Sequence, residues 1–509
     1  MSMVPQQLKS SGPMSWVPSM EQRLWLIATV VILINALSQL LVSSTADQDQ
    51  AGELLRSQWW AWEYGSQPPL YTWIVKTIFI ATGPSLWALQ AIKVFLLSTL
   101  IAAILGIGQR LNFSPNQQLI SICGFTLIPQ FLWESQRDLT HSVLASVIAA
   151  LTVLQWLILE RHRTWWNYGI AGILVAAGML AKYNYLLLLG GLLLASSSLF
   201  TYRRILIDRR TLFAVLLACV LLSPHLIWVL SHPDVALGGL DKLKNDPAIL
   251  SNRVMGLLNA LSSAFRFLTP LWIAALILLM GRTPRDVSRQ PGEELLLRLP
   301  LFIGILLLIV ILTTGATRIK DRWYQSLLVT TPVLVASLAG KDPPSRRRHI
   351  VAALSGSAVI ISSLLLPGRT VLAGQTRKIS RPNLPLPELL RSIRAEGFPP
   401  QVILTSDNFL AGNARLIFPE ARILSSRSAS LATVESLPGL GTQVLVLRST
   451  ATDQESLPKI LQAFQIDATG FTIQSRTRPL HWAPKKTYSL EWTRLQLPIL
   501  VDAQRDLHG

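Results

Sequence analysis

A succession of apolar runs constrains the fold of this chain more than any other feature of its sequence. A helix that crosses the hydrocarbon core of a bilayer needs roughly 20 mostly apolar residues, and its backbone polar groups must be satisfied within the helix. The runs predict an α-helical polytopic membrane protein with about eleven transmembrane helices, at residues 23–42, 86–107, 116–133, 142–159, 167–181, 184–200, 211–229, 264–280, 299–315, 324–340 and 350–367.

The composition agrees with a lipid environment. Half of the 509 residues are hydrophobic and 15% are charged, which is too apolar for soluble domains of this length. A formal net charge of +18 would suggest a nucleic-acid partner in a soluble protein, but here the Lys and Arg residues cluster in short segments between the apolar runs. We therefore expect no nucleic-acid partner and interpret the charge as a signal of membrane topology.

Alternate connections between the runs are basic, as the positive-inside rule requires of cytoplasmic loops. This predicts a cytoplasmic N-terminal tail at 1–22 and a transmembrane domain at 23–367, in the inner or plasma membrane. The odd helix count then places residues 368–509 on the extracytoplasmic side. The basic residues of the predicted inner connections include Arg203, Arg204, Arg209, Arg210, Arg282, Arg285, Arg289, Lys341, Arg346, Arg347 and Arg348.

The predicted exported segment differs in composition from the membrane domain. It is Pro-rich and polar, with short β-like runs at 401–405 and 443–447, which predict a small α/β domain. The stretch 381–387 has the composition of a linker. No catalytic motif is evident in this domain.

The first outer loop, residues 43–85, is long and aromatic for a plain connection, and residues 50–62 have the spacing of an amphipathic helix lying at the membrane interface. Asp49 lies in this loop, where a membrane-anchored substrate would present its head group, and is a candidate general base. The alternative is that Asp47 and Asp49 are solvated loop acids and that the neighbouring Trp side chains only anchor the interface.

Several residues of this loop form a motif with regular spacing. The motif resembles the first outer loop of the type C glycosyltransferases of family 39, which include protein O-mannosyltransferases and the lipid A aminoarabinose transferase. The matching residues are Asp49, Ala51, Ser57, Gln58, Trp62, Tyr64, Pro68 and Pro69. The resemblance implies that Asp49 is the catalytic base and that Tyr64 and Pro68 contact the substrate.

Further segments up to about residue 340 resemble the same family in order. Residues 137–141 are similar to its second outer loop, residues 166–183 to a Gly-rich helix that closes on Lys-Tyr, and residues 320–323 to a late basic-aromatic motif. The substrate-binding residues implied by these matches are Asp138, Lys182, Tyr183, Lys320 and Arg322. Asp138 could equally cap a helix beginning near Thr140, and the cations could be snorkelling side chains without a ligand.

Two positions depart from the family pattern. The Glu that usually follows the catalytic Asp is Gln50 here, and the usual aromatic residue four positions after that Asp is Glu53. These changes could alter the specificity or abolish the activity.

The implied reaction is attack by an acceptor hydroxyl on the anomeric carbon of a sugar carried by a polyprenyl phosphate, with inversion by analogy. Asp49 would take the proton, and fixed cations would stabilise the leaving phosphate. The partners would be this donor, membrane lipid, and a lipid, glycan or protein acceptor. Isolated His141 and His225 lack partners at ligand spacing, so no metal site and no cofactor are predicted.

Two other functions fit the same sequence. A transporter or lipid flippase would also have many helices with a basic inner side, although such proteins usually carry ionisable residues near the middle of the membrane. A catalytically inactive relative that binds lipid is the other alternative, and the changes at Gln50 and Glu53 favour it.

Overall fold

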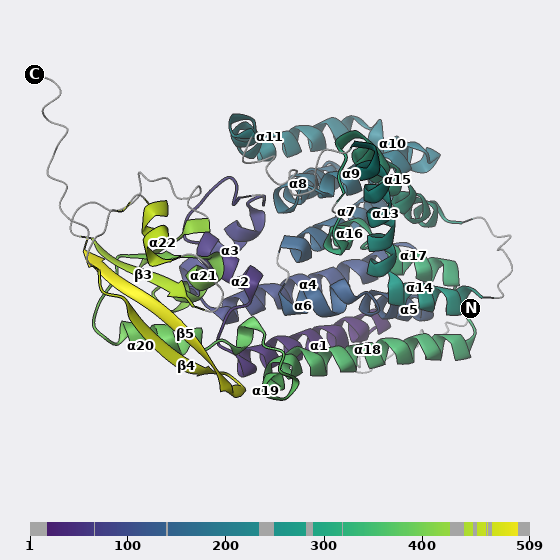
Figure 1. Cartoon of the computed structure of the whole chain (residues 1–509). Coiled ribbons are helices and arrows are strands. Elements are labelled where there is room, and N and C mark those ends of the chain that lie inside the picture. The colour runs from purple at the N-terminus through teal and green to yellow at the C-terminus, as the bar shows by residue number, and fades with distance from the viewer. Residues whose placement is uncertain are drawn as a thin grey trace, which may run out of the picture.

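The computed structural model describes residues 18–65, 67–138, 141–233, 249–280, 289–317, 319–427, 442–450, 456–464, 466 and 471–496. The predicted tail at 1–22 lies mostly outside the described residues. Long helices run roughly parallel to form a bundle, and a small sheet lies beyond one end of it (Figure 1).

Six helices among the described residues are long and apolar enough to cross a membrane: α1 (Met20–Val42), α4 (Leu86–Arg110), α7 (His141–Arg161), α11 (Arg209–Ser231), α15 (Pro291–Thr314) and α18 (Ser345–Val371). A pair bent by 66°, α13 (Ile249–Phe267) and α14 (Thr269–Leu279), could form a seventh span. Large apolar side chains such as Ile227 and Leu230 of α11 point outward. Lipid, unlike water, solvates such a surface at no cost.

The mostly helical polytopic architecture is confirmed, whereas the count of eleven stays a prediction. Several predicted runs form shorter helices, including α8 (Trp165–Ala181) and α9 (Tyr185–Ser197). The run at 116–133 is divided into α5 (Pro115–Thr126) and a π-helical turn at Gln130–Glu134. The run at 324–340 is divided into α16 (Tyr324–Leu327) and α17 (Thr331–Ala339), because Pro332 cannot continue a helix but can begin one.

The first outer loop contains two helices, α2 (Gln48–Arg56) and α3 (Leu70–Thr82). The interfacial helix predicted over 50–62 is wrong in its length and its environment. Helix α2 ends at Arg56, and every residue from Gln50 to Leu55 is buried in the protein. Its apolar side faces other helices of the same chain and not the lipid.

The C-terminal part of the described chain is a small α/β unit. Its sheet has the strand order β2-β1-β3-β5-β4, in which β1 is parallel to β2 and β3, and β5 is antiparallel to β3 and β4. The strands are β1 (Val402–Thr405), β2 (Arg422–Ser425), β3 (Gln443–Ser449), β4 (Gln474–Leu480) and β5 (Ala483–Gln496), and the main helices are α20 (Leu386–Arg394), α21 (Asn408–Ile417) and α22 (Leu457–Ala463).

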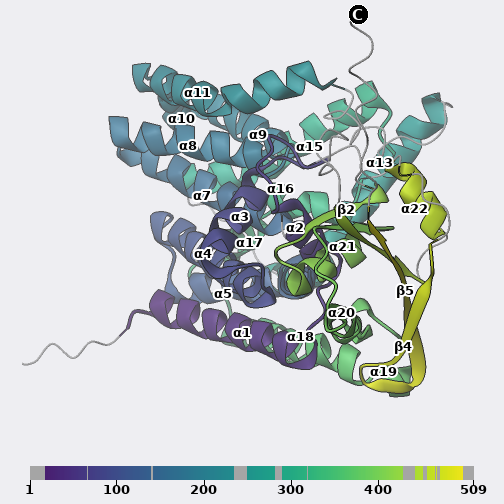
Figure 2. The ribbon, with the colours of Figure 1, turned by 90° about the vertical axis from the view of Figure 1, so that its left-hand side faces the viewer.

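The stretch at 381–387 is not a free linker. It forms a 3-10 turn, Arg381–Asn383, and the first residues of α20. Asn383 is buried and donates hydrogen bonds to the carbonyls of Thr370 (2.8 Å) and His481 (3.0 Å). Figure 2 shows the result: the C-terminal unit lies close against the first outer loop, with α21 beside α2.

Candidate functional site

Helix α2 begins with a capping box. The Asp47 carboxylate accepts a hydrogen bond from the Gln48 amide (2.9 Å), and the Gln50 side chain accepts one from the Asp47 amide (3.2 Å). A Gln at the third helical position suits this arrangement. The departure at Gln50 is therefore accommodated by local helix structure.

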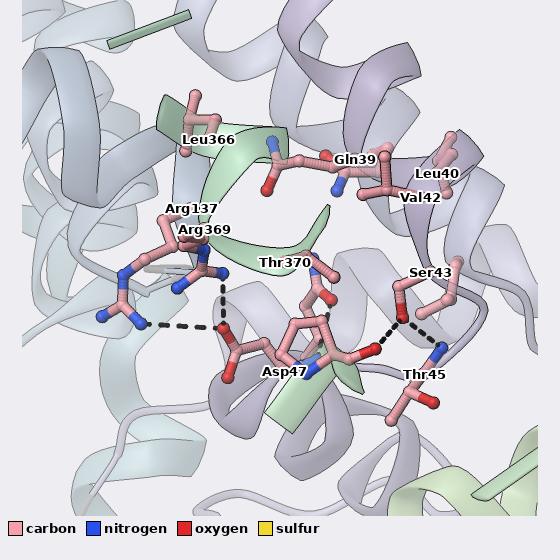
Figure 3. A pocket seen from close by; sticks show the side chains of 14 residues that line it. Gln39, Leu40, Val42, Ser43, Thr45, Asp47, Arg137, Leu366, Arg369 and Thr370 are labelled. Carbon is pink, nitrogen blue, oxygen red and sulfur yellow. Dashed lines mark hydrogen bonds and ion pairs between the residues drawn. The ribbon is translucent and has the colours of Figure 1, made fainter. Parts of the chain in front are cut away.

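Asp47 is also the buried centre of an ion-pair cluster whose two Arg side chains are partly exposed. Its carboxylate lies 3.1 Å from Arg369 at the end of α18 and 3.6 Å from Arg137, and only 5% of the residue is exposed. Figure 3 shows both guanidinium groups directed at this carboxylate. Asp47 is thus a structural anchor, and the alternative that it is a solvated loop acid is wrong.

Asp138 holds the same helix from another segment of the chain. Its carboxylate accepts hydrogen bonds from the backbone amides of Asp49 (both oxygens at 3.1 Å) and Gln50 (3.3 Å). Asp138 therefore caps α2, while residues 139 and 140, where the sequence suggested a helix start, lie outside the described residues. Burial raises the pKa of Asp138, and the nearby charges of Asp47 and Asp49 raise it further.

An open cavity of about 690 Å³ lies beside the start of α2. Its lining combines four of the predicted site residues, Asp49, Asp138, Lys320 and Arg322, with residues from α13 and from the C-terminal segment. The remaining lining residues are Gln48, Gln130, Glu134, Arg137, Asn259, Ser263, Arg266, Thr317, Ile319, Asp321 and Arg381.

The cations around this cavity differ in their bonding. Arg266 pairs with Asp321 (3.1 Å) and Arg137 pairs with Glu134 (2.7 Å). Lys320 and Arg322, in contrast, are exposed, and within the described part of the chain neither has a hydrogen-bonded or ion-paired partner. These two cations are available to an anionic ligand.

Lys182 lies just past the end of α8, close to the same charges. Its ammonium group donates a hydrogen bond to the Ser142 hydroxyl (2.6 Å). Burial lowers the pKa of Lys182 to about 7, the charge of Arg322 lowers it further, and the charge of Asp49 opposes the shift. These charge effects place Lys182 within electrostatic reach of both cavity residues.

Glu53, the second departure, is completely buried and fully bonded. It contacts His141 (2.9 Å), Arg56 (2.6 Å) and Thr72 (2.8 Å). Burial alone would raise the pKa of Glu53, but its contacts with His141, Arg56 and Thr72 together lower it to about 2. An ionised Glu53 thus joins α2 to α3 and α7. Polar partners surround this Glu, which stands where the family usually has an aromatic residue.

Besides Lys182, three predicted residues do not line the cavity. The Tyr64 hydroxyl is used inside its own loop, where it donates to the Trp59 carbonyl (2.7 Å) and accepts from the Ala61 amide (3.0 Å). Pro68 is buried before α3. The Tyr183 hydroxyl lies 3.2 Å from His225 Nε2. A substrate-binding role for these three residues stays a prediction.

Glu63, which the sequence did not single out, is buried beside Tyr183. Only 2% of the residue is exposed, and neither carboxylate oxygen has a hydrogen-bond partner among the described residues. Burial raises the pKa of Glu63 to about 7, although the neighbouring Tyr183 hydroxyl opposes the shift. A neutral carboxylic acid at this position avoids a buried, unpaired charge.

Sequence reasoning also missed Arg137, Arg266 and Arg381 of the cavity lining. Arg137 was part of a recognised segment but carried no assigned role. Arg266 lies at the outer end of the predicted membrane run 264–280, where cations run against the positive-inside bias, and this exception could have marked it. Arg381 lies far away in sequence and gave no local signal.

Comparisons with known proteins identify relatives over most of the chain. Residues 66–228 match the sequence model of a family described as dolichyl-phosphate-mannose-protein mannosyltransferase. The chain is 33% identical over 401 residues to the lipopolysaccharide core galacturonosyltransferase RgtB of Rhizobium johnstonii, covering 76% of this chain and 80% of that one. It is 26% identical over 418 residues to RgtA of the same organism, covering 78% and 81%.

The fold is similar to that of solved membrane glycosyltransferases. The structure of ArnT from Cupriavidus metallidurans bound to undecaprenyl phosphate matches with a TM-score of 0.59 at 10% identity, over 92% of this chain and 97% of that one. The arabinofuranosyltransferase AftD from Mycobacteria matches with a TM-score of 0.50 at 12% identity, over 94% of this chain and 40% of that one.

Proposed function

Because the chain belongs to the type C glycosyltransferase family that contains the lipopolysaccharide core galacturonosyltransferases, we propose that it transfers one sugar from a polyprenyl-phosphate donor to an acceptor hydroxyl. The reaction takes place on the extracytoplasmic face of the inner or plasma membrane, with the N-terminus in the cytoplasm and the C-terminal domain outside.

One observation carries this proposal. Asp49, Asp138, Lys320 and Arg322 come from three separate segments of the chain, yet all four line the same cavity. Lys182 is close enough for Asp49 and Arg322 to influence its charge. Transfer from a lipid phosphate needs both a base and fixed cations, and this cavity offers both.

Asp49 acts as the general base. The backbone amides of Asp49 and Gln50 are held by Asp138, which fixes the first turn of α2. As the acceptor oxygen attacks the anomeric carbon, the Asp49 carboxylate takes the hydroxyl proton. A base in this position contributes roughly 10²–10⁴-fold to the rate.

The leaving group is the polyprenyl phosphate. When the bond between the anomeric carbon and the phosphate oxygen breaks, the electron pair moves to the phosphate. Arg322 offers bidentate hydrogen bonds and Lys320 a point charge, and both are unpaired before the donor binds. Lys182 gains its full charge as the phosphate approaches, because an anion favours the protonated amine.

The relatives suggest the sugar and the acceptor. RgtA and RgtB are named as galacturonosyltransferases of the lipopolysaccharide core. By analogy the donor of this enzyme is a polyprenyl-phosphate galacturonate, and the acceptor is a hydroxyl of a lipid-linked core glycan. No cofactor or divalent cation has a role in this mechanism.

The test is transfer by the purified full-length protein in proteoliposomes. The substrates are polyprenyl-phosphate galacturonate and a lipopolysaccharide core acceptor, and the products are the extended core and free polyprenyl phosphate. Asp49→Asn should lower the turnover by about 10²-fold or more, because the amide cannot accept the proton. Asn is nearly isosteric, so the thermal midpoint should stay unchanged.

Other outcomes decide between the alternatives. Undiminished transfer by Asp49→Asn would remove the assigned role of Asp49. Movement of the donor across the bilayer without covalent transfer would identify a flippase. Donor binding without turnover, against several acceptors, would identify an inactive relative.

A further inference from the structure

The contacts between the first outer loop and the C-terminal domain assign a role to that domain, in which no catalytic motif is evident. We propose that the domain is a positioning element of the catalytic centre: α21 and β2 hold α2, and through it Asp49, in place at the cavity. The catalytic part of this inference rests on the proposed role of Asp49.

Helices α2 and α21 meet backbone to backbone. A Cβ atom added at Gly412 would overlap the carbonyl group of Ala51 and would lie 2.5 Å from its Cα atom. Only a glycine allows this approach, because a side chain at position 412 would push the helices apart. Ala51 lies two residues after Asp49, so any shift of this contact moves the candidate base.

Polar contacts fix the segment that leads into α2. The Asn413 side chain accepts a hydrogen bond from the Ala46 amide (2.8 Å). The hydroxyls of Thr45 and Ser43 each donate to a backbone carbonyl of the C-terminal segment, those of Leu384 and Pro382 (both 2.7 Å). The chain entering α2 is therefore bound to the domain at three positions between Ser43 and Ala46.

Gln58 fixes the other end of the helix. Its amide nitrogen donates to the Ile423 carbonyl (2.9 Å), and its amide oxygen accepts from the Ile423 amide (2.9 Å). Strand β2 is the edge of the sheet, and the Gln58 side chain satisfies this edge as a neighbouring strand would. This pairing accounts for Gln58, which no step of the proposed reaction uses, whereas the Ser57 hydroxyl donates to the Leu54 carbonyl (3.1 Å).

Helix α2 depends on such support because it has nine residues. Isolated helices shorter than about 12–15 residues are marginal in water. The position of Asp49 is thus set by tertiary contacts at both ends of α2 and along its length. Residues Gln58, Gly412 and Asn413 are positioning residues, since none of them lines the cavity.

Gln58→Glu in the full-length protein tests the inference. At about pH 8 the carboxylate cannot donate to the Ile423 carbonyl and repels it, whereas at about pH 3.5 the Glu is mostly protonated and both donates and accepts, as Gln does. We expect amide hydrogen exchange of residues 48–56 to be about tenfold faster than in the wild type at pH 8 and within about twofold of it at pH 3.5. At pH 8, kcat should fall about tenfold with little change in the donor KM.

Two matched variants separate pairing from charge. Gln58→Met has a similar shape but no hydrogen bonds, so it should lose the same protection at both pH values. Gln401→Glu adds a carboxylate at an exposed position next to β1 and should behave as the wild type. The inference is overturned if Gln58→Glu exchanges as the wild type does at pH 8, or if its defect is the same at both pH values.

Gly412→Ala gives an independent measurement. Gly304→Ala in α15 is the control, because nothing lies within 4 Å of a Cβ at that helical position. We expect faster exchange of residues 48–56 only in Gly412→Ala, and equal exchange in the two variants would contradict the helix contact. Asp49→Asn should lower transfer by about 10²-fold or more without changing the exchange of α2. Full transfer by Asp49→Asn would therefore refute the base without affecting the exchange result.

Discussion

Asp47 and Asp49 lie two residues apart at the start of the same helix, yet their surroundings differ completely. Asp47 faces a small pocket in which Arg137 and Arg369 neutralise it. Asp49 faces an open cavity of about 690 Å³, where Lys320 and Arg322 have no partner within the described residues. The ion pairs of Asp47 stabilise the fold, whereas the cavity beside Asp49 contains unpaired cations that can bind an anionic ligand.

This difference offers a rule for separating structural charges from functional ones in an outer loop. A buried charge is tolerated when it is paired, and such a pair gives little to a substrate. Unpaired cations that face a cavity, on the side of the membrane where the topology bias disfavours them, need another reason to be there. Each of the following predictions tests one side of this comparison.

The largest effect is expected from the unpaired cations. The double variant Lys320→Ala/Arg322→Ala removes the charges that would stabilise the leaving phosphate, so kcat/KM for the lipid-linked donor should fall by about 10³-fold. Steady-state transfer kinetics in proteoliposomes measure this loss. Arg266→Ala is the control, because Arg266 already pairs with Asp321, and it should change kcat/KM by less than about tenfold. Equal losses of kcat/KM in the double variant and in Arg266→Ala would contradict the distinction between paired and unpaired cations.

The second effect concerns two buried acids of the outer loop, of which Glu53 is paired and Glu63 is not. The pKa of Glu63 is raised to about 7, so between its unfolded value of 4.5 and pH 7 the unfolded state loses a proton that the folded state keeps. Stability therefore falls as the pH rises through this window, by about 3 kcal/mol in total.

Glu63→Gln, which mimics the protonated acid, measures this dependence. It should match the wild type near pH 4.5 and exceed its thermal midpoint at pH 8. Glu420→Gln, at an exposed carboxylate, should show no such trend. A constant difference between Glu63→Gln and the wild type at all pH values would contradict the prediction.

Asp47→Asn should give a smaller loss of stability. Asn still caps the helix, so this change isolates the ion pairs with Arg137 and Arg369. Because both guanidinium groups are partly exposed, we expect a loss of about 2 kcal/mol and not the full cost of a buried unpaired charge. Asp208→Asn, at a more exposed cap with a single partner, Arg210, should lose less than about 1 kcal/mol. Chemical unfolding in detergent compares the two proteins.

The smallest expected effect is that of a chelator. No group of three or more His, Cys, Asp or Glu residues in the described chain could hold a metal ion, and the proposed chemistry uses protein cations alone. Incubation with EDTA followed by gel filtration should change kcat by less than about twofold, well below the loss seen when a catalytic metal is removed. A large loss that Mg²⁺ or Mn²⁺ restores would require a different account of the leaving group.

The membrane helices could be predicted from the sequence because hydropathy is a local property. The predicted run at 142–159 corresponds to α7 and the run at 211–229 to α11. Prediction was weaker where tertiary contacts decide the structure. The periodicity of residues 50–62 suggested contact with lipid, but α2 buries its apolar side against the protein, since Gly412 lets α21 approach it.

The site residues likewise divide into those that a local motif predicts and those that depend on long-range contacts. Asp49, Asp138, Lys320 and Arg322 could be named because their spacing resembles a known family, and the structure brings these four together. Arg381 joins the cavity from the C-terminal segment, and the pairing of Gln58 with Ile423 spans 365 positions. No spacing within a motif reports contacts of that range. The unpaired carboxylate of Glu63 likewise becomes visible only when its neighbours are known.

The backbone contact between Ala51 and Gly412 has a consequence for recombining such proteins. A chimaera that takes its C-terminal domain from one homologue and its membrane helices from another cuts this junction, even though the linear breakpoint near residue 368 appears convenient. The unit of exchange is discontinuous and combines residues 43–58 with everything after the last membrane helix. Chimaeras that exchange both segments together should keep their turnover. Chimaeras that exchange only one segment combine two interface surfaces from different homologues and should lose turnover.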